Sequence, residues 1–224
     1  MRASQIRMIS SNSILLLDKP AGESSFATIH TFSKLFKVKI GHTGTLDPFA
    51  TGLMISLTGR YTRLNQFFCG QDKTYEATMR LGVTTDTLDP TGTVLSEDNK
   101  WQGLTEGDIR NAFFSLQGEL NYRAPLFSAK KIAGTCSYKY ARKQMDIVRP
   151  MVSSMIHQIT IQEIQLPIIR FTVTCSTGTY IRSIAEMAGK ILDSGAILEE
   201  LRRTSIGKYH LAHLSENLNH RDRN

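Results

Sequence analysis

Residues 41–52 form the densest cluster of residue types suited to chemistry, with the sequence Gly-His-Thr-Gly-Thr-Leu-Asp-Pro-Phe-Ala-Thr-Gly. Glycine allows positive φ and a close approach of the backbone to a ligand, and Pro48 removes an amide donor. The run therefore cannot continue as a regular helix or a central strand. We expect a surface loop, and surface loops on rigid scaffolds often carry catalytic residues. Asp47 is the only acid in it, which makes Asp47 the candidate catalytic group.

A purely structural role would explain the same residues. The side chain of an aspartate that precedes proline often accepts hydrogen bonds from nearby backbone amides in a turn. Asp47 could do no more than this, and one short motif does not decide between the two roles.

The composition bounds the class of protein. The chain has 224 residues, of which 41% are hydrophobic and 21% charged, as in ordinary globular proteins. It has no apolar run long enough to span a bilayer and no signal-peptide pattern near its start, so we expect a cytoplasmic protein. Cys69, Cys136 and Cys175 are far apart and form no C-x-x-C pair, which argues against a disulfide framework and a zinc site. No P-loop or G-x-G-x-x-G motif indicates a nucleotide cofactor.

The net charge of +7 and the pI near 9.4 favour a polyanionic partner, because Lys and Arg neutralise phosphates and release counterions. One concentration of cations lies in residues 130–143, where they alternate with tyrosines in a way typical of RNA recognition. A solvated surface helix would explain that segment equally well. Arg202 and Arg203 form a second basic cluster.

Hydrophobic periodicity predicts alternating strands and helices. Strands are expected at residues 14–17, 53–57, 74–81 and 169–175. Helices are expected at residues 26–36, at 60–68, after the capping box Thr105-x-x-Asp108, and after Thr179. Arg182 falls in the first turn of the last helix, where the helix dipole disfavours a cation, so we expect a fixed anionic partner for it. No repeat or linker is evident, and one domain is the simplest arrangement.

The order and spacing of these motifs resemble the TruB-type tRNA pseudouridine synthases, which isomerise the T-loop uridine (position 55) of tRNA. The resemblance covers roughly residues 14–210. It rests on residues 41–48 with 50–52, 18–20, 73–75, 81–82 with 85–87, 138–142, 176–182 and 201–203.

The resemblance implies an α+β fold, the pseudouridine synthase catalytic core, with a mixed, mainly antiparallel sheet, flanking helices and a central RNA-binding cleft. It places the catalytic domain at residues 1–214 and leaves a polar, disordered tail at 215–224. Members of this family often continue into a PUA domain, for which we expect no counterpart here. Weaker and more salt-sensitive RNA binding would follow. The implied partner is the T-arm of tRNA, with no metal, no cofactor and no membrane, and a monomer is the default.

The resemblance also assigns roles to individual residues. Asp47 matches the catalytic aspartate, Tyr75 the tyrosine that stacks on the target base, and Arg182 the arginine that pairs with the aspartate. The remaining matches and basic residues are expected to bind substrate: His42, Lys19, Tyr180, Leu201, Lys130, Arg142 and Arg202.

These residue types suit the reaction. Pseudouridine formation breaks the N1–C1′ bond, rotates the uracil and rejoins it through C5. A carboxylate can attack C1′ or uracil C6, or act as a base, and the sequence does not choose among these. An adjacent arginine would keep Asp47 ionised, since an opposite charge lowers the pKa of a carboxylate. Tyr75 could hold the base after it leaves its stack, and it is also a candidate base for the C5 proton.

Two other classes of protein compete with this interpretation. A non-catalytic tRNA-binding or tRNA-folding module would share the basic surface and the fold, but it would need none of Asp47, Tyr75 and Arg182. A glycosidic hydrolase usually needs two carboxylates with different protonation roles. The loop at residues 41–52 offers one acid, so we discount the hydrolase.

Overall fold

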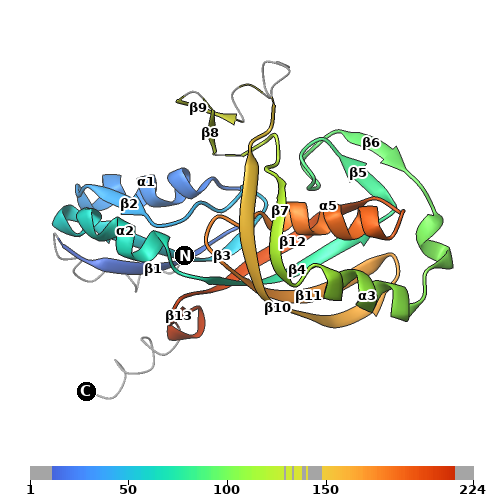
Figure 1. Ribbon diagram of the computed structural model, residues 1–224. Helices are drawn as coiled ribbons and strands as arrows, with labels where there is room; N and C mark the ends of the chain where they lie inside the picture. The colour runs from blue at the N-terminus through green and yellow to red at the C-terminus, as the bar shows by residue number, and fades with distance from the viewer. Residues whose placement is uncertain (1–11, 129, 133, 138–139, 141–147, 215–224) are drawn as a thin grey trace. The chain divides into compact units, whose positions relative to one another are not determined.

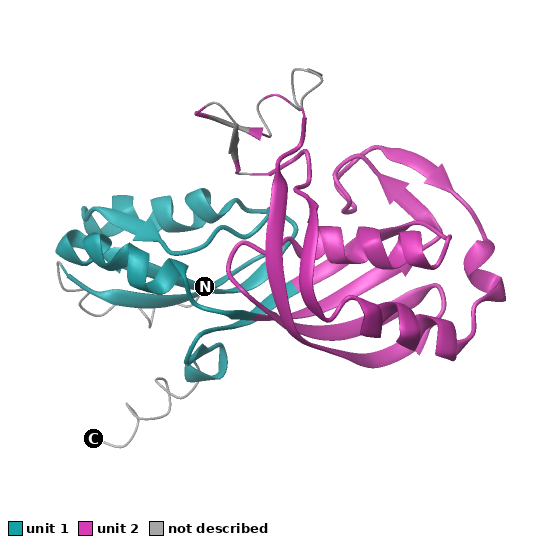
Figure 2. Ribbon diagram, viewed as in Figure 1, with its two compact units in different colours: residues 1–73, 202–224 teal, residues 74–201 magenta. Residues whose placement is uncertain are grey.

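The computed structural model describes residues 12–128, 130–132, 134–137, 140 and 148–214 (Figure 1). The chain divides into two compact units (Figure 2). The first unit consists of Met1–Lys73 and Arg202–Asn224, and the second of Thr74–Leu201. The predicted tail at residues 215–224 lies outside the described residues, and the assignment of residues 1–214 to a single catalytic domain stays a prediction.

Strand β3 (Thr51–Thr58) organises the sheet of the first unit. It pairs antiparallel with β1 (Ile14–Lys19) and with β2 (Ile40–His42). It also pairs in parallel with the part of β12 (Ala196–Ile206) that belongs to this unit, with Arg202 beside Thr51 and Arg203 beside Gly52. Strand β13 (Tyr209–His210) continues antiparallel from β12. Seven of the eight residues of β3 are buried, as expected of a strand covered on both faces.

The helices of the first unit only partly match the predictions. Helix α1 (Ser25–Phe36) is confirmed, with the Ser24 hydroxyl accepting a hydrogen bond from the Ala27 amide. Phe26 has the helical spacing of the buried Ile29 but is itself 66% exposed. The single helix predicted at residues 60–68 is instead a 3-10 helix, η2 (Gly59–Leu64), followed by α2 (Asn65–Cys69).

In the second unit the strands run in the order β12-β4-β11-β10-β7. Their bounds are β4 Lys73–Leu81, β11 Ile168–Cys175, β10 Met151–Gln165 and β7 Gly118–Arg123. Strand β10 pairs antiparallel with both β11 and β7. The predicted alternation along β4 is confirmed, since Tyr75, Ala77, Met79 and Leu81 are all buried. The expected α+β fold with a mixed, mainly antiparallel sheet is therefore confirmed.

Two longer helices belong to the second unit. Helix α3 (Glu106–Ser115) begins at the predicted capping box, in which Thr105 and Asp108 exchange both expected hydrogen bonds. Helix α5 (Ile181–Ile191) follows β11, and Tyr180 occupies its N-cap position without a side-chain capping hydrogen bond. Short elements complete the unit: β5 (Val83–Thr85), β6 (Val94–Glu97), η3 (Lys100–Gly103), β8 (Lys131–Ile132) and β9 (Thr135–Cys136). Among the described residues, no helix has the length and apolar character needed to cross a membrane.

Gly52 has no room for a side chain. Its φ is +108°, a backbone conformation that side-chain-bearing residues rarely adopt. A Cβ atom at this position would lie 2.3 Å from the carbonyl oxygen of Arg203 and 2.6 Å from its nitrogen. Both atoms are backbone atoms of the paired strand β12, so they cannot rotate away. The pairing of β3 with β12 thus requires glycine here.

We predict that Gly52→Ala lowers the free energy of unfolding by about 3 kcal/mol or more, because it combines backbone strain with overpacking. Urea titration followed by circular dichroism measures this change. Gly70→Ala is the control, since Gly70 has a φ of −75° and a methyl group added there would have open space within 4 Å. It should change stability by less than about 1 kcal/mol. Equal effects of the two substitutions would contradict the prediction.

Candidate active site

The loop that contains Asp47 (residues 41–52, hereafter the Asp47 loop) begins in β2 and ends in β3. The two strands hold its ends side by side, with His42 opposite Ser56 and the Thr43 amide donating to the Ile55 carbonyl at 3.0 Å. Within the loop, the Ala50 amide donates to the Asp47 carbonyl at 3.1 Å and closes a turn. This bond uses the main-chain carbonyl of Asp47, so the structural role considered for its side-chain carboxylate stays a prediction. Asp47 itself is half-buried.

Lys19 fastens one side of the Asp47 loop. Its side chain is fully buried, and its ammonium donates to the carbonyls of Pro20, Pro48 and Ala50 at 2.9, 3.2 and 2.7 Å. An ammonium group has three protons, and each has an acceptor here. Burial lowers the pKa of Lys19; the charges of Glu23 and Asp47 oppose that effect, and Arg203 adds to it. These bonds give Lys19 a structural role in the loop, while its predicted contact with substrate stays a prediction.

Ser25 holds the residue that precedes Asp47. Its hydroxyl accepts a hydrogen bond from the Leu46 amide at 2.8 Å and donates one to the Leu46 carbonyl at 3.0 Å. Ser25 and Leu46 are both buried. Because Ser25 is the first residue of α1, these bonds attach the loop to the start of a helix, and they restrain the backbone directly beside Asp47.

Arg203 fastens the other side of the loop. Its Nε donates to the Leu53 carbonyl at 2.7 Å and its Nη2 to the Gly44 carbonyl at 3.0 Å, and the residue is 1% exposed. A Cβ at Gly44 would lie 3.4 Å from Nη1 of Arg203 and 3.6 Å from Cε of Lys73. One buried guanidinium therefore joins the beginning and the end of the loop. Arg203 follows Arg202 in a basic cluster of the sequence, and nothing in that pattern predicts this role.

His42, expected to contact the flipped nucleotides, lies at the end of β2. Burial lowers the pKa of its imidazole, the charge of Arg203 lowers it further, and a backbone contact at Gly44 opposes both. The ring is consequently neutral near pH 7, and a neutral ring can pack against a base without burying a charge there.

This lowered pKa predicts how stability depends on pH. Above the ordinary histidine pKa of about 6.5, His42 is neutral in both the folded and the unfolded states. As the pH falls below that value, the unfolded state takes up the proton first, so the free energy of unfolding should decrease. Comparing urea midpoints at about pH 7.5 and about pH 5.5 in wild type and His42→Gln isolates this contribution. The variant should lose less stability on acidification, and an equal loss in both proteins would contradict the prediction.

The second unit contains the other residues that the resemblance singled out. Tyr75 lies on β4 and is 6% exposed, and Leu201 lies on β12 and is 7% exposed. The Tyr180 amide donates to the Tyr122 hydroxyl at 3.0 Å, and Tyr122 in turn shares a hydrogen bond with Ser154 at 3.1 Å. Burial raises the pKa of the Tyr122 hydroxyl, which keeps it protonated. These contacts fix the start of α5, next to Arg182.

Arg182 is buried, with 3% of its surface exposed, and its guanidinium contacts several partners. Its Nη1 donates to the Thr87 carbonyl at 2.6 Å, and its Nη2 donates to the Phe127 carbonyl at 2.8 Å. Nη1 also lies 3.5 Å from Oδ2 of Asp89, a buried carboxylate. Asp89 is thus an anionic partner of the kind that the helix dipole predicted for a first-turn arginine. The prediction that Arg182 pairs with Asp47 is separate, and it stays a prediction.

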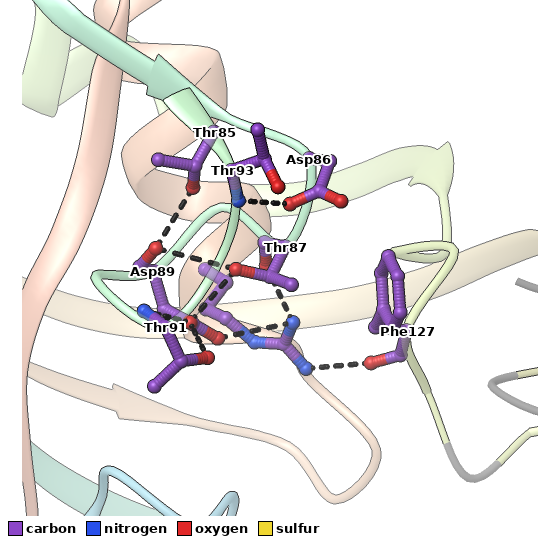
Figure 3. A network of polar contacts seen from close by, with 8 residues as sticks. Thr85, Asp86, Thr87, Asp89, Thr91, Thr93 and Phe127 are labelled. Atoms are coloured by element: carbon purple, nitrogen blue, oxygen red, sulfur yellow. Dashed lines mark hydrogen bonds and ion pairs between the residues drawn. The ribbon is translucent and has the colours of Figure 1, made fainter. Parts of the chain in front are cut away.

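The loop at residues 85–93 is built around Asp89 (Figure 3). Oδ1 of Asp89 accepts hydrogen bonds from the Thr87 hydroxyl at 2.8 Å and from the Thr91 amide and hydroxyl at 3.0 and 2.5 Å. The Asp89 carbonyl accepts from the Thr85 hydroxyl at 2.8 Å. These bonds satisfy one carboxylate oxygen and leave the other directed at Arg182. The motif at residues 85–87 that carries the resemblance ends before Asp89, so Asp89 was not predicted from the sequence.

We predict that Asp89→Asn destabilises the protein by about 3 kcal/mol, because removing one partner leaves the other charge of a buried pair uncompensated. Asp86→Asn is the control in the same loop. Asp86 is exposed and accepts one bond, from the Thr93 amide at 2.8 Å, so its substitution should cost about 1 kcal/mol. Thermal and urea unfolding of both variants check this difference. If the two substitutions cost similar free energy of unfolding, the contribution of Asp89 to stability would not depend on its burial beside Arg182.

The remaining predicted substrate contacts are distributed over both units. Arg202 forms an ion pair with Asp18 at 2.8 Å and contacts the Thr51 hydroxyl at 3.3 Å. Lys130 is exposed in the second unit, and Arg142 lies outside the described residues. The first unit therefore holds Lys19, His42, Asp47 and Arg202. The second holds Tyr75, Lys130, Tyr180, Arg182 and Leu201.

In the part of the chain that is described, no cluster of three His, Cys, Asp or Glu residues could hold a metal ion.

Solved structures share this fold. The chain superposes on a structure titled "Crystal Structure of a Cbf5-Nop10-Gar1 Complex" with a TM-score of 0.67 and 28% identity, covering 89% of this chain and 50% of that one. An archaeal box H/ACA sRNP Nop10-Cbf5 complex gives a TM-score of 0.64 and 26% identity, covering 93% and 51%. The chain thus spans about half the length of these solved chains. The sheet and helices are those of a pseudouridine synthase catalytic fold.

Sequence comparison defines the family within that fold. The family described as "TruB family pseudouridylate synthase (N terminal domain)" matches residues 33–181. The tRNA pseudouridine synthase B of Caldicellulosiruptor saccharolyticus is 44% identical over 198 residues, which is 88% of this chain and 68% of the relative. The enzyme of the same name from Chlamydia pneumoniae is 46% identical over 198 residues, 88% of this chain and 83% of the relative. The chain belongs to the TruB family, and its reaction is an isomerisation that yields pseudouridine.

Proposed function

We propose that the chain converts uridine 55 in the T-loop of tRNA to pseudouridine, with Asp47 as the catalytic carboxylate. The observation that carries the role of Asp47 is the restraint of its loop by three buried side chains, Lys19, Ser25 and Arg203. A turn that served only to connect two strands would not need buried cations on both sides. The two relatives compared above, at 44% and 46% identity, are tRNA pseudouridine synthases B, which supports tRNA as the substrate and with it a cytoplasmic location.

In this proposal the target uridine leaves its stack, because the reacting atoms are inaccessible inside a folded RNA. The N1–C1′ bond breaks, the uracil turns, and a C5–C1′ bond forms while C5 loses a proton and N1 gains one. Asp47 either attacks C1′ or C6 of the uridine or removes a proton. A restrained loop favours each of these steps, because it holds the carboxylate in position before the substrate binds.

Neighbouring groups would assist Asp47 electrostatically. Asp47 already attracts the Lys19 ammonium, since its charge raises the pKa of Lys19 against the effect of burial. The same attraction favours the ionised carboxylate that the chemistry requires. Arg182 is buried and held by two carbonyls, so we propose it as a second, preorganised cation for the site. Tyr75 would hold the everted base, and the neutral His42 would pack against the displaced nucleotides.

The test is release of tritium from an unmodified tRNA transcript labelled at uridine C5. We expect release by the wild type and a loss of about a hundredfold or more in Asp47→Asn, which keeps the shape of the side chain but removes its charge. Asp72→Asn is the matched control, because Asp72 is an exposed carboxylate of the same unit. It should react at the wild-type rate.

The outcomes separate the competing functions. Release by wild type and Asp72→Asn but not by Asp47→Asn would support the isomerase with Asp47 at its centre. Tight tRNA binding without release by any of the three proteins would favour the non-catalytic tRNA-binding module instead. Equal release by all three proteins would support the isomerase activity but exclude Asp47 as its catalytic group.

A further inference from the structure

The net positive charge of the chain comes from one of its two units. Met1–Lys73 and Arg202–Asn224 together contain 14 Lys and Arg against 6 Asp and Glu, a net charge of +8. Thr74–Leu201 contains 13 Lys and Arg against 14 Asp and Glu, a net charge of −1. The second unit includes the basic segment at residues 130–143 that sequence analysis singled out, yet it is nearly neutral overall.

The two units also differ in how their exposed cations are paired. In the second unit, four exposed cations have acidic partners: Lys100 with Asp193, Arg110 with Glu106, Arg170 with Glu163 and Lys190 with Glu186. In the first unit, six exposed cations form no ion pair with any described residue. One is Lys208, whose ammonium lies over the Tyr209 ring, and the other five lie between residues 34 and 63. These five are Lys34, Lys37, Lys39, Arg60 and Arg63. Between residues 26 and 70 the only acid is Asp47, so this region has almost no counter-charge of its own.

These five cations come from neighbouring elements. Lys34 lies in the last turn of α1, Lys37 is its C-cap, and Lys39 directly precedes β2. The Gly59 amide donates to the Lys39 carbonyl at 2.9 Å, which places the start of η2 beside that residue. Arg60 and Arg63 are three residues apart in η2, the spacing at which side chains of a 3-10 helix lie on one face. Strand β2 then leads directly into the Asp47 loop.

We propose that Lys34, Lys37, Lys39, Arg60 and Arg63 form a phosphate-binding face that holds the RNA backbone next to the nucleotide presented to the Asp47 loop. Unpaired, exposed cations are what phosphate binding requires, because each one can displace a counterion without first breaking an internal ion pair. The inference rests on the proposed function, since the RNA is taken to be the substrate. The face differs from the predicted basic segment at residues 130–143 and from Arg202, which already pairs with Asp18.

An anionic membrane is the other partner that clustered cations can bind. A membrane-surface helix carries its cations on one long amphipathic helix with an opposite apolar face. Here the cations are spread over a 12-residue helix, the residues after it and a 3-10 turn. That arrangement, in a member of an RNA-modifying family, favours RNA.

The test compares two variants with the same change in charge. The first carries Lys34→Gln, Lys39→Gln, Arg60→Gln and Arg63→Gln. The matched control carries Lys100→Gln, Arg110→Gln, Arg170→Gln and Lys190→Gln, which also removes two lysines and two arginines. The two variants have the same net charge. The control also leaves four carboxylates without their cationic partners, so a loss of RNA affinity that came from net charge alone would be at least as large in the control. Binding to an unmodified tRNA transcript is measured over a range of salt concentrations, and single-turnover tritium release is measured at saturating protein.

For the first variant we expect the slope of log Kd against log salt to fall by about 3, and Kd at about 0.1 M salt to rise about tenfold or more. Its single-turnover rate at saturation should stay within about twofold of wild type, because the chemistry is untouched. The control variant should keep the wild-type slope.

Three results would overturn the proposal. An equal reduction of the slope in both variants would show that only net charge matters, and an unchanged, wild-type slope in both would show that phosphates are bound elsewhere. Loss of binding to phosphatidylserine vesicles with unchanged RNA binding would assign the face to a membrane. If the wild type binds tRNA but releases no tritium, the proposed function fails, whereas the comparison of slopes still decides whether the face binds RNA.

Discussion

The parallel contact between Gly52 of β3 and Arg203 of β12 is the constraint on which the first unit depends. Without a side chain at Gly52, the backbone of Arg203 can approach closely enough for the strands to pair. That approach brings the Arg203 guanidinium beneath the Asp47 loop, where it reaches both Gly44 and Leu53. A buried arginine is expensive unless its donors are satisfied. Here the loop carbonyls provide that satisfaction, so the strand pairing and the loop geometry stabilise each other.

In the second unit, a buried arginine is compensated by a carboxylate instead of by carbonyls alone. Arg182 occupies the first turn of α5, where the exposed backbone amides disfavour a cation. The loop at residues 85–93 compensates by directing one oxygen of Asp89 at the arginine while threonines and an amide saturate the other oxygen. The Asp47 loop and Arg182 are therefore each held by a polar network within one unit, rather than by apolar packing alone.

Local patterns allowed much of the fold to be predicted. The alternation along β4 and the capping box of α3 depend on residues within a few positions of each other, and both were confirmed. Predictions failed where a distant residue decides the outcome. Phe26 is exposed although it fits the helical period, because the buried side of α1 is set by Ser25 contacting Leu46, 21 positions away. The helix expected at residues 60–68 changes type at Asn65, which no single-residue preference indicates.

The candidate site likewise divides into residues that local sequence motifs could indicate and residues whose roles depend on distant contacts. Asp47, Tyr75 and Arg182 could be singled out because their motifs resemble a known family, and Arg182 also carried a dipole argument. The supporting residues could not be found in this way. Lys19 reaches Ala50 across 31 positions and Arg203 reaches Leu53 across 150, so their roles exist only in the folded chain. Asp89 was hidden for a different reason, since a threonine-rich turn and a buried anion site have the same composition.

The separation of Arg203 from the loop that it fastens has a consequence for biosynthesis. The bond from Arg203 to Gly44 closes a span of 159 positions, and the ribosome makes Gly44 long before Arg203. During most of translation the Asp47 loop therefore lacks one of its two buried cations, although β1, β2 and β3 are already available to pair. The loop can reach its final geometry only after residue 203 has left the ribosome. A nascent or truncated chain that ends before β12 would thus carry Asp47 without the fastened loop around it.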